Sequence, residues 1–270
     1  MTAVATPPER VRGRAEVSGY RDMWAAAPPD LAERHGVAAR DLDGGVLLAC
    51  AALPSSRMLN HALGLGLDGP VDLDAVEAFY AEAGAPCAVA VDDTADGLRA
   101  GLEARGFRED RPWATFHRPA GPVDAPATSL RVTGTDATTA SAFGGVVAAG
   151  FGMPPEFSAW VAALVGRPSW TCLLAWDGPT PVGAAALHLR GDSAWFALGA
   201  TLPEHRGKGA QGALFAARAA VASAAGARHF VTETGAPLPG DGPGPSHRNM
   251  LRAGFAEAAL RPNLVSPGMP

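Results

Sequence analysis

The chain has 270 residues, of which 47% are hydrophobic and 18% charged, and its formal net charge is −5. This balance is typical of a folded globular protein rather than a disordered one, and the length allows one or two domains. The basic residues include a single lysine, Lys208, and form no basic block. We therefore expect no nucleic-acid partner, because phosphates require clustered cations.

No stretch approaches the roughly 18 apolar residues that a membrane-spanning helix requires. The first 15 residues also lack the apolar core of a signal peptide. We therefore expect no membrane partner and a cytoplasmic protein. Three cysteines, Cys50, Cys87 and Cys172, lie far apart in apolar runs and lack metal-ligand spacing. They are predicted to be buried free thiols, with neither a disulfide framework nor a metal site.

The N-terminal half is predicted to consist of a tail, residues 1–18, and a domain, residues 19–119. Residues 71–83 have the apolar spacing of an amphipathic helix. The predicted elements of this domain are, in order, a helix, a strand, a helix and a closing strand, at 71–83, 87–91, 94–105 and 113–117.

A stretch rich in Pro, Gly and Ala, residues 118–128, predicts a linker at 120–128 and a second domain at 129–270. The second domain is predicted to run strand, helix, helix, three strands, helix, strand, helix, strand. A meander followed by a crossover helix implies a mixed, mostly antiparallel sheet flanked by helices, that is, an α/β (α+β) fold. The first strand and helix are predicted at 129–132 and 136–149, and a second helix begins at 154. Three strands follow at 170–176, 182–189 and 194–202. After the loop 203–209, a long helix ends at about 225, and a strand at 229–234, a helix at 247–253 and a last extended piece complete the domain.

The two halves end in a similar way. Leu102–Phe107 and Met250–Phe255 both read as the end of a helix followed by Gly-Phe and a strand. We interpret this as a tandem repeat of one fold. Chance similarity between two helix endings is the alternative.

The most informative stretch is residues 194–214, which reads as a strand, a Pro turn, a Gly-rich loop and a helix. The first backbone N–H groups of a helix lack intrahelical partners, and the helix dipole adds positive potential there. Gly207 and Gly209 have no Cβ, so the backbone can approach an anion closely. Arg206 and Lys208 add positive charge. The pattern predicts a diphosphate-sized anion site built mainly from main-chain donors.

Two nucleotide motifs fit this loop less well. The spacing Gly207-x-Gly209-x-x-Gly212 satisfies the dinucleotide fingerprint, with Glu233 near the position of the ribose-binding acid. However, residues 203–206 intervene between the strand and the first Gly, where that fold turns at once, so a nucleotide-dependent oxidoreductase is a distant alternative. The phosphate-binding Walker loop fails because Gly209 follows Lys208, where Ser or Thr is required.

The loop resembles the signature of the GNAT acetyltransferase superfamily, which lies between a splayed strand and a helix. This signature is an Arg or Gln, any two residues, a Gly, any one residue, and then Gly or Ala. Here it reads Arg206-Gly-Lys-Gly209-Ala-Gln211, and the resemblance covers the whole C-terminal half in element order. The last position is Gln where the family has Gly or Ala, but Gly212 follows. By this resemblance, acetyl-CoA or another acyl-CoA is the cofactor and no metal takes part. The pyrophosphate would be held by Arg206, Gly207, Lys208, Gly209, Ala210, Gln211 and Gly212, and the pantetheine and acyl group would be lined by Ala200, Thr201 and Leu202.

Two positions depart from the family pattern for acid–base catalysis. Met250 stands where many members have a Tyr that protonates the leaving thiolate, and Gly244 replaces a common Asn. Glu233, on a strand that should border the cofactor, is our candidate general base, with an Arg pair at the sheet edge as the alternative. His247 and Ser246 read as a helix cap or, less favourably, as an acid. Outside these candidates, His205 is expected to be solvated and His188 to point outward from a strand.

The N-terminal half has no counterpart of the cationic loop. Its Gly-rich stretch, residues 63–69, contains Asp68, which would repel a phosphate. We therefore expect two GNAT-like units, of which only the second binds cofactor. The predicted function is acyl transfer to an amine of a small molecule. A CoA-binding sensor or scaffold without catalysis is the alternative. The sequence leaves the acceptor and the oligomeric state open.

Overall fold

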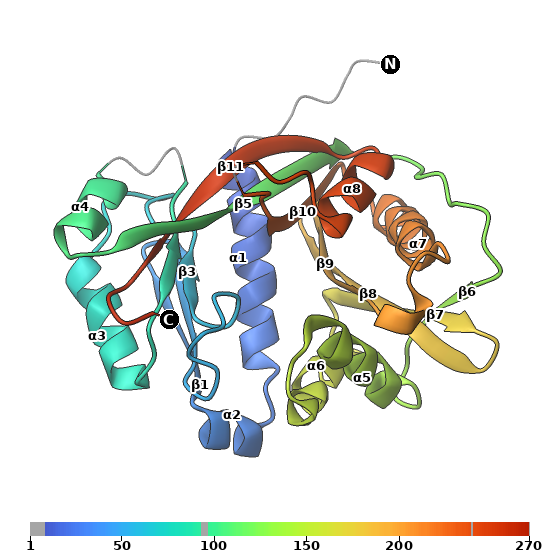
Figure 1. The fold of residues 1–270 in the computed structure, drawn as a ribbon, viewed down its shortest axis with the longest axis horizontal. Coiled ribbons are helices and arrows are strands. Elements are labelled where there is room, and N and C mark those ends of the chain that lie inside the picture. Colours follow the sequence, from blue (N-terminus) through green and yellow to red (C-terminus); the bar gives the residue numbers. More distant parts are fainter. Residues whose placement is uncertain (1–8, 93–96, 239, 270) are drawn as a thin grey trace. The chain divides into compact units, whose positions relative to one another are not determined.

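A computed structural model describes residues 9–92, 97–238 and 240–269 (Figure 1). The chain forms two compact units. Unit 1 contains Phe116–Thr232 and Pro243–Ala258, and unit 2 contains Pro7–Thr115, Glu233–Gly242 and Ala259–Pro270. Each unit therefore combines separate stretches of the chain, and the last residues belong with the N-terminal half.

The element order predicted for the C-terminal half is confirmed, and unit 1 contains all of it except most of the last strand, which belongs to unit 2. Four strands form an antiparallel meander, and a fifth pairs in parallel with the last of them after a crossover helix. Its strands are β6 (Arg131–Gly134), β7 (Trp170–Asp177), β8 (Thr180–Arg190), β9 (Ser193–Thr201) and β10 (His229–Gly235), of which β10 continues from Glu233 onward in unit 2. Its helices are α5 (Ala140–Phe151), η1 (Pro155–Phe157), α6 (Ser158–Ala162), η2 (Pro203–His205), α7 (Ala210–Ala224) and α8 (Pro245–Arg252).

Helices cover both faces of the unit 1 sheet (Figure 1). α5 approaches β9 closely, since a Cβ on Gly150 would lie 2.6 Å from the Cβ of Ala200. On the opposite face, a Cβ on Gly183 of β8 would lie 3.3 Å from the Cβ of Ala210 of α7. Small residues thus bring both helices onto the strands that precede the Gly-rich loop. The core under α7 is made of Leu130, Leu173, Ala175, Val182, Ala185, Ala210 and Leu214.

Unit 2 has the strand order β1-β2-β3-β4-β11-β5. Residues 9–18, expected to be part of a tail, form the first half of a helix, whereas residues 1–8 and 94–96 of the expected tail and helix lie outside the described residues. Its helices are α1 (Glu9–Ala25), α2 (Pro29–His35), α3 (Leu73–Ala83) and α4 (Leu98–Ala104). Its strands are β1 (Val37–Leu42), β2 (Gly45–Cys50), β3 (His61–Leu63), β4 (Ala88–Ala90), β5 (Arg108–Pro119) and β11 (Ala256–Val265).

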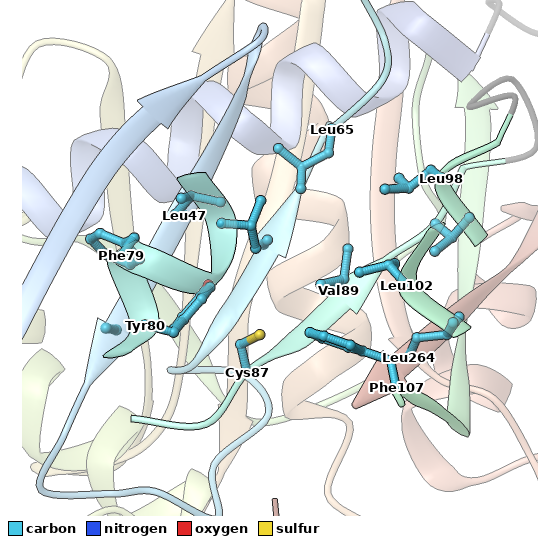
Figure 2. Packing of buried hydrophobic residues seen from close by; sticks show 14 of the residues in the cluster. Leu47, Leu65, Phe79, Tyr80, Cys87, Val89, Leu98, Leu102, Phe107 and Leu264 are labelled. Atoms are coloured by element: carbon cyan, nitrogen blue, oxygen red, sulfur yellow. The ribbon is translucent and has the colours of Figure 1, made fainter. Parts of the chain in front are cut away.

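The hydrophobic core of unit 2 lies between its sheet and helices α3 and α4 (Figure 2). α3 is capped by Asp72, whose carboxylate accepts a hydrogen bond from the N–H of Ala75. It contributes Val76, Phe79 and Tyr80 to this core. Leu264 of β11 lies in the same cluster, so the end of the chain helps to complete the core of unit 2. Other members are Leu47, Ala62, Leu65, Val89, Leu98, Leu102 and Phe107.

Both units contain a pair of parallel strands joined by a loop and a helix. In unit 1 these are β9 and β10, joined through α7, and in unit 2 they are β3 and β4, joined through α3. The two helix endings that resemble each other in sequence also share one conformation. Gly106 and Gly254 both adopt left-handed backbone, with φ of 81° and 80°, and each is followed by a buried Phe. This shared order supports the predicted repeat.

The opposite face of the unit 2 sheet, under α1, carries buried charge. Arg261 of β11 donates to Glu16 of α1 and to Asp92, each at 2.6 Å, and all three side chains are at most 2% exposed. Burial lowers the pKa of the Arg261 guanidinium. The negative charges of Glu16, Asp92 and Glu233 have a larger opposite effect, so the pKa is raised well above its usual value. By forming ion pairs with Glu16 and Asp92, the Arg261 guanidinium links the last strand to the first helix.

Replacing Arg261 with Ala is therefore expected to destabilise the protein strongly. The change leaves two buried carboxylates without a counter-charge, and losing one partner of a buried ion pair costs about 3–5 kcal/mol. Arg99→Ala is the matched control, because Arg99 pairs with Glu103 and Glu109 at the surface, where such pairs contribute about 1 kcal/mol or less. Urea denaturation measures both free energies of unfolding. Equal effects of the two changes would show that the buried cluster is not a structural link.

Candidate functional site

The Gly-rich loop lies at the N-terminus of α7, as predicted. Gly207 and Gly209 adopt left-handed backbone, with φ of 78° and 87°, which favours Gly over any other residue. Gly209 is the N-cap of α7, and no side chain caps this helix end. Because α7 is 15 residues long, its first N–H groups combine with a full helix dipole. Nothing lies within 4 Å of the Cβ position of Gly207, so the loop is open at that residue.

The two cations of the loop have different surroundings. Lys208 donates to Asp177 of β7 at 2.7 Å, and this pair lowers the pKa of the Asp177 carboxyl. His205, expected to be solvated, faces the same carboxylate, with its Nδ1 3.6 Å from Oδ2. Arg206 is exposed and forms no ion pair within the described part of the chain. Among the residues that the structure describes, Arg206 is therefore the loop cation that no carboxylate neutralises.

The residues just before β6 pack against one side of the loop. Thr128 donates its hydroxyl to the carbonyl of Lys208 at 2.6 Å. A Cβ on Gly212 would lie 2.7 Å from Pro126, and one on Gly209 would lie 3.2 Å from Thr128. Gly209 and Gly212 are therefore required for contact with this segment, whereas Gly207 faces open space.

β9 contains a bulge just before the loop. Ala186 of β8 pairs with Ala197 and Ala184 pairs with Ala200, so two residues of β9, Leu198 and Gly199, lie opposite one residue of β8. Leu198 adopts left-handed backbone with φ of 52°, which is uncommon for a residue with a large side chain. Bulges of this kind often re-aim backbone groups beside a binding site.

The expected lining residues lie just after this bulge. Gln211 of α7 donates its amide to the carbonyl of Ala200 at 2.8 Å and to the hydroxyl of Thr201 at 3.0 Å. The backbone N–H of Leu202 donates a hydrogen bond to the carbonyl of Val182 at 3.0 Å. Sequence reasoning did not select Leu198 and Gly199. The single Gly inside a strand pattern was the available signal, since such a residue commonly marks a bulge.

Glu233, the predicted base, lies in unit 2 and is buried, with 7% of its side chain exposed. The hydroxyl of Tyr20 donates to its Oε1 at 2.9 Å, and Arg261 lies 3.6 Å from its Oε2. Burial, together with the nearby charge of Glu16, raises the pKa of Glu233 well above its usual value. The side chain thus belongs to a buried polar network with α1 and β11, in which it forms an ion pair with Arg261, as in the alternative interpretation, but inside the protein.

Glu233 also lines a small cavity of unit 2, of about 10 Å³, which has room for about one water. His61 is another lining residue. Burial lowers its pKa to about 4, with a smaller contribution from Arg261, so the imidazole is neutral at pH 7. The lining residues are Arg57, His61, Leu63, Ala88, Ala90, Trp113, Glu233, Arg261 and Asn263.

Other candidate polar residues differ in their surroundings. Met250 is buried in α8, and Gly244 is the N-cap of that helix, so Ser246 and His247 do not cap it. The ring of His247 meets the ring of Phe116 edge-on, and its Nε2 lies 3.4 Å from Glu257. The expectation that His188 points outward is wrong. His188 is 3% exposed and packs against the ring of Trp170, its cross-strand partner on β7, because this face of the meander is buried.

Comparison with solved structures identifies the architecture. A GCN5-related N-acetyltransferase from Kribbella flavida matches with a TM-score of 0.62 at 17% identity, over 95% of this chain and 96% of that one. The chain has the GNAT fold. A GCN5-related N-acetyltransferase from Sphaerobacter thermophilus matches with a TM-score of 0.56 at 16% identity, over 97% and 94% of the two chains. A tandem GNAT protein from the clavulanic acid biosynthesis pathway matches with a TM-score of 0.54 at 16% identity, over 93% and 94%.

No family model matches the sequence, and no curated protein matches it. The GNAT fold is therefore shown by structure over nearly the whole chain, which is divided into two units. Each is a mixed, mostly antiparallel sheet flanked by helices. Among the described residues, no cluster of three or more potential ligands could hold a metal ion, and no helix is long and apolar enough to cross a membrane. Cys50, Cys87 and Cys172 are free and buried.

Proposed function

We propose that the protein is an acyl-CoA-dependent N-acyltransferase that transfers an acyl group, most simply acetyl, to an amine of a small molecule. The observation that carries this proposal is the open loop at Gly207, at the uncapped N-terminus of α7 and directly after the bulge of β9. Main-chain donors at a helix N-terminus fit a pyrophosphate, and a bulged strand fits a thioester carbonyl. The fold supports the same reading.

The cofactor would supply an acyl group activated as a thioester. Residues Arg206 to Gly212 would hold its pyrophosphate, with the exposed Arg206 adding positive charge. Ala200, Thr201 and Leu202 would line the pantetheine, and the neighbouring bulge would orient the acyl carbonyl. The Asp177 carboxylate already neutralises Lys208, so Lys208 would contribute less to anion binding than its charge suggests.

In the proposed reaction the amine nitrogen attacks the thioester carbonyl, a C–N bond forms, and the C–S bond breaks to release a thiolate. The attacking amine must lose one proton, and we assign Glu233 as the group that accepts it. A carboxyl accepts a proton only in its ionised form, so this role requires a pH above the raised pKa of Glu233. No Tyr stands at position 250, so no side-chain acid is assigned to the thiolate. Unit 2 lacks a cationic loop and is proposed to bind no cofactor.

Incubation of the full chain with acetyl-CoA and a panel of amines tests this proposal. The panel comprises amino acids, small amine drugs, secondary metabolites and peptides with a free N-terminus. Thiol release, detected by a colorimetric reagent, and mass spectrometry of the acylated amine are the two readouts. Acylation of at least one small amine is expected. No transfer to any member would contradict the assignment of an acyltransferase.

A further inference from the structure

Arg218 of α7 is a buried cation without a counter-charge. Its side chain is among the largest fully buried ones, with 1% exposed, and no carboxylate contacts it within the described residues. Burial lowers the pKa of its guanidinium to about 9, which still leaves the group charged at pH 7. Such groups are rarely buried without a partner, because desolvation of a charge is costly.

The guanidinium is held by neutral groups. Phe196 and Phe215 lie on it with ring centroids 4.9 and 4.5 Å from the guanidinium carbon. Its Nε donates to the carbonyl of Leu214, one turn earlier on α7. Its Nη1 donates to the carbonyls of Ala186 and Ala197, at 3.4 and 3.3 Å. Nη2 has no hydrogen-bond partner among the described residues.

The two carbonyls that share Nη1 belong to opposite strands at the edge of the bulge. Ala186 of β8 and Ala197 of β9 are the pair that directly precedes it. Two further side chains hold carbonyls of β9. The hydroxyl of Thr232 donates to Phe196 at 2.8 Å, and the amide of Gln211 donates to Ala200 at 2.8 Å. Side chains from α7 and β10 therefore fix the backbone on both sides of Leu198 and Gly199.

The unpartnered Nη2 lies behind the exposed point of the bulge. Gly199 is exposed, and a Cβ there would lie 3.9 Å from Nη2 and 2.9 Å from the amide oxygen of Gln211. A ligand group at Gly199 would thus meet the positive potential of Nη2, an atom that is itself shielded from water. Positive potential from a buried cation acts strongly on the negative charge that develops on an acyl oxygen.

We propose that Arg218 is a positioning residue for the acyl group. It holds the bulge of β9 open between β8 and α7, and it makes the bulge electropositive where the thioester carbonyl binds. This inference rests on the proposed function for its second part, while its first part concerns the free protein alone. An apolar side chain of similar volume would also pack against the two rings, so a purely structural role would not require the charge.

Arg218→Met tests the proposal, and Arg218→Lys is the matched control that keeps the charge. Met has a similar length and no charge, and replacing a buried charge with an apolar side chain is often neutral or stabilising, so folding is expected. Calorimetric titration with acetyl-CoA and with free CoA compares ligands that differ only at the acyl group. We expect Arg218→Met to weaken acetyl-CoA binding about tenfold and CoA binding much less, with partial recovery in Arg218→Lys.

Hydrogen exchange of the free protein tests the first part without any ligand. In Arg218→Met, amides of residues 194–202 should exchange at least about tenfold faster than in the wild type, whereas those of β7 should not change. Thr232→Val, which removes only the hydroxyl donor to Phe196, should shift exchange in the same direction by less. This variant carries the test if Arg218→Met does not fold.

Unchanged exchange in residues 194–202, or a parallel loss of acetyl-CoA and CoA affinity, would overturn the proposal. Failure of the proposed function gives a different result. In that case the wild type itself binds neither acetyl-CoA nor CoA, while the exchange experiment still reports on the bulge.

Discussion

Replacing Gly207 with Glu is expected to weaken acetyl-CoA binding more than a hundredfold relative to Gly207→Gln. Both variants place a side chain of the same size at a residue with φ of 78° and open space around its Cβ position. They therefore share the same backbone strain, and only the charge differs. One added negative charge about 5 Å from a phosphate costs about 3 kcal/mol at an effective dielectric constant near 20. Calorimetric titration of both variants measures the difference.

The neutral variant controls for the geometry of the loop. Gly207→Gln should introduce only the strain of a left-handed non-Gly residue, which costs about 1–2 kcal/mol. Part of this cost appears as reduced stability and not as reduced affinity. Raising the salt concentration should narrow the gap between the two variants, because the added charge is solvent-exposed. Equal affinities of the two variants would mean that no phosphate lies near Gly207.

Glu233→Gln is expected to lower turnover by about 10²–10⁴-fold while leaving acetyl-CoA affinity unchanged, because a general base contributes about this much to the rate. Gln keeps the size of the side chain and can still accept the hydrogen bond from Tyr20. Steady-state kinetics with an accepted amine, together with calorimetry, separates the two quantities. Loss of affinity and turnover together would assign Glu233 to structure, and unchanged turnover would remove it as the base.

The same substitution has a thermodynamic signature. The pKa of Glu233 is raised in the folded state, so the folded protein keeps its proton while the unfolded chain loses it above about pH 4.5. The free energy of unfolding of the wild type therefore decreases as pH rises from there to the folded pKa. Glu233→Gln has no carboxyl at this position and does not lose stability in this way. Its free energy of unfolding should therefore rise relative to that of the wild type between about pH 4.5 and the folded pKa of Glu233. His61, whose pKa is lowered to about 4, is present in both proteins, so its contribution cancels.

The elements of unit 1 could be predicted because their signals are local. The meander is punctuated by Asp-Gly-Pro and Arg-Gly-Asp turns, and the loop before α7 carries its Gly residues at the positions where the backbone is left-handed. Gly106 and Gly254 likewise mark two helix ends of one conformation. In each case the residue type reports a backbone conformation within a few residues.

The first 70 residues gave no such signal. α1 contains Gly13 and Gly19, and its buried face includes Glu16, which reads as a solvent-exposed residue in isolation. Its burial becomes favourable only through Arg261, 245 positions later. The placement of β11 beside β4 has the same origin, because pairing of Leu264 with Val89 depends on distant parts of the chain. Ion pairs and strand pairings between distant parts of the sequence cannot be predicted from local periodicity.

Part of the site was also not predicted. Gln211 departs from the family pattern at its position, and its amide is used to hold the carbonyl of Ala200. Arg218 lies on a helix face that otherwise consists of small and apolar residues, but α7 is rich in Ala all round, so its sequence does not distinguish a buried Arg from an ordinary surface Arg. The bulge that both residues support is a property of two strands and one helix together.

The most direct test of the central claim is calorimetric titration of the purified full chain with acetyl-CoA, free CoA and NADH. We expect one acetyl-CoA site per chain, with binding of free CoA as well and none of NADH, because we propose that the loop of unit 1 holds the CoA pyrophosphate. Absence of binding by either CoA compound would contradict the proposed function. The GNAT likeness would then describe the fold alone.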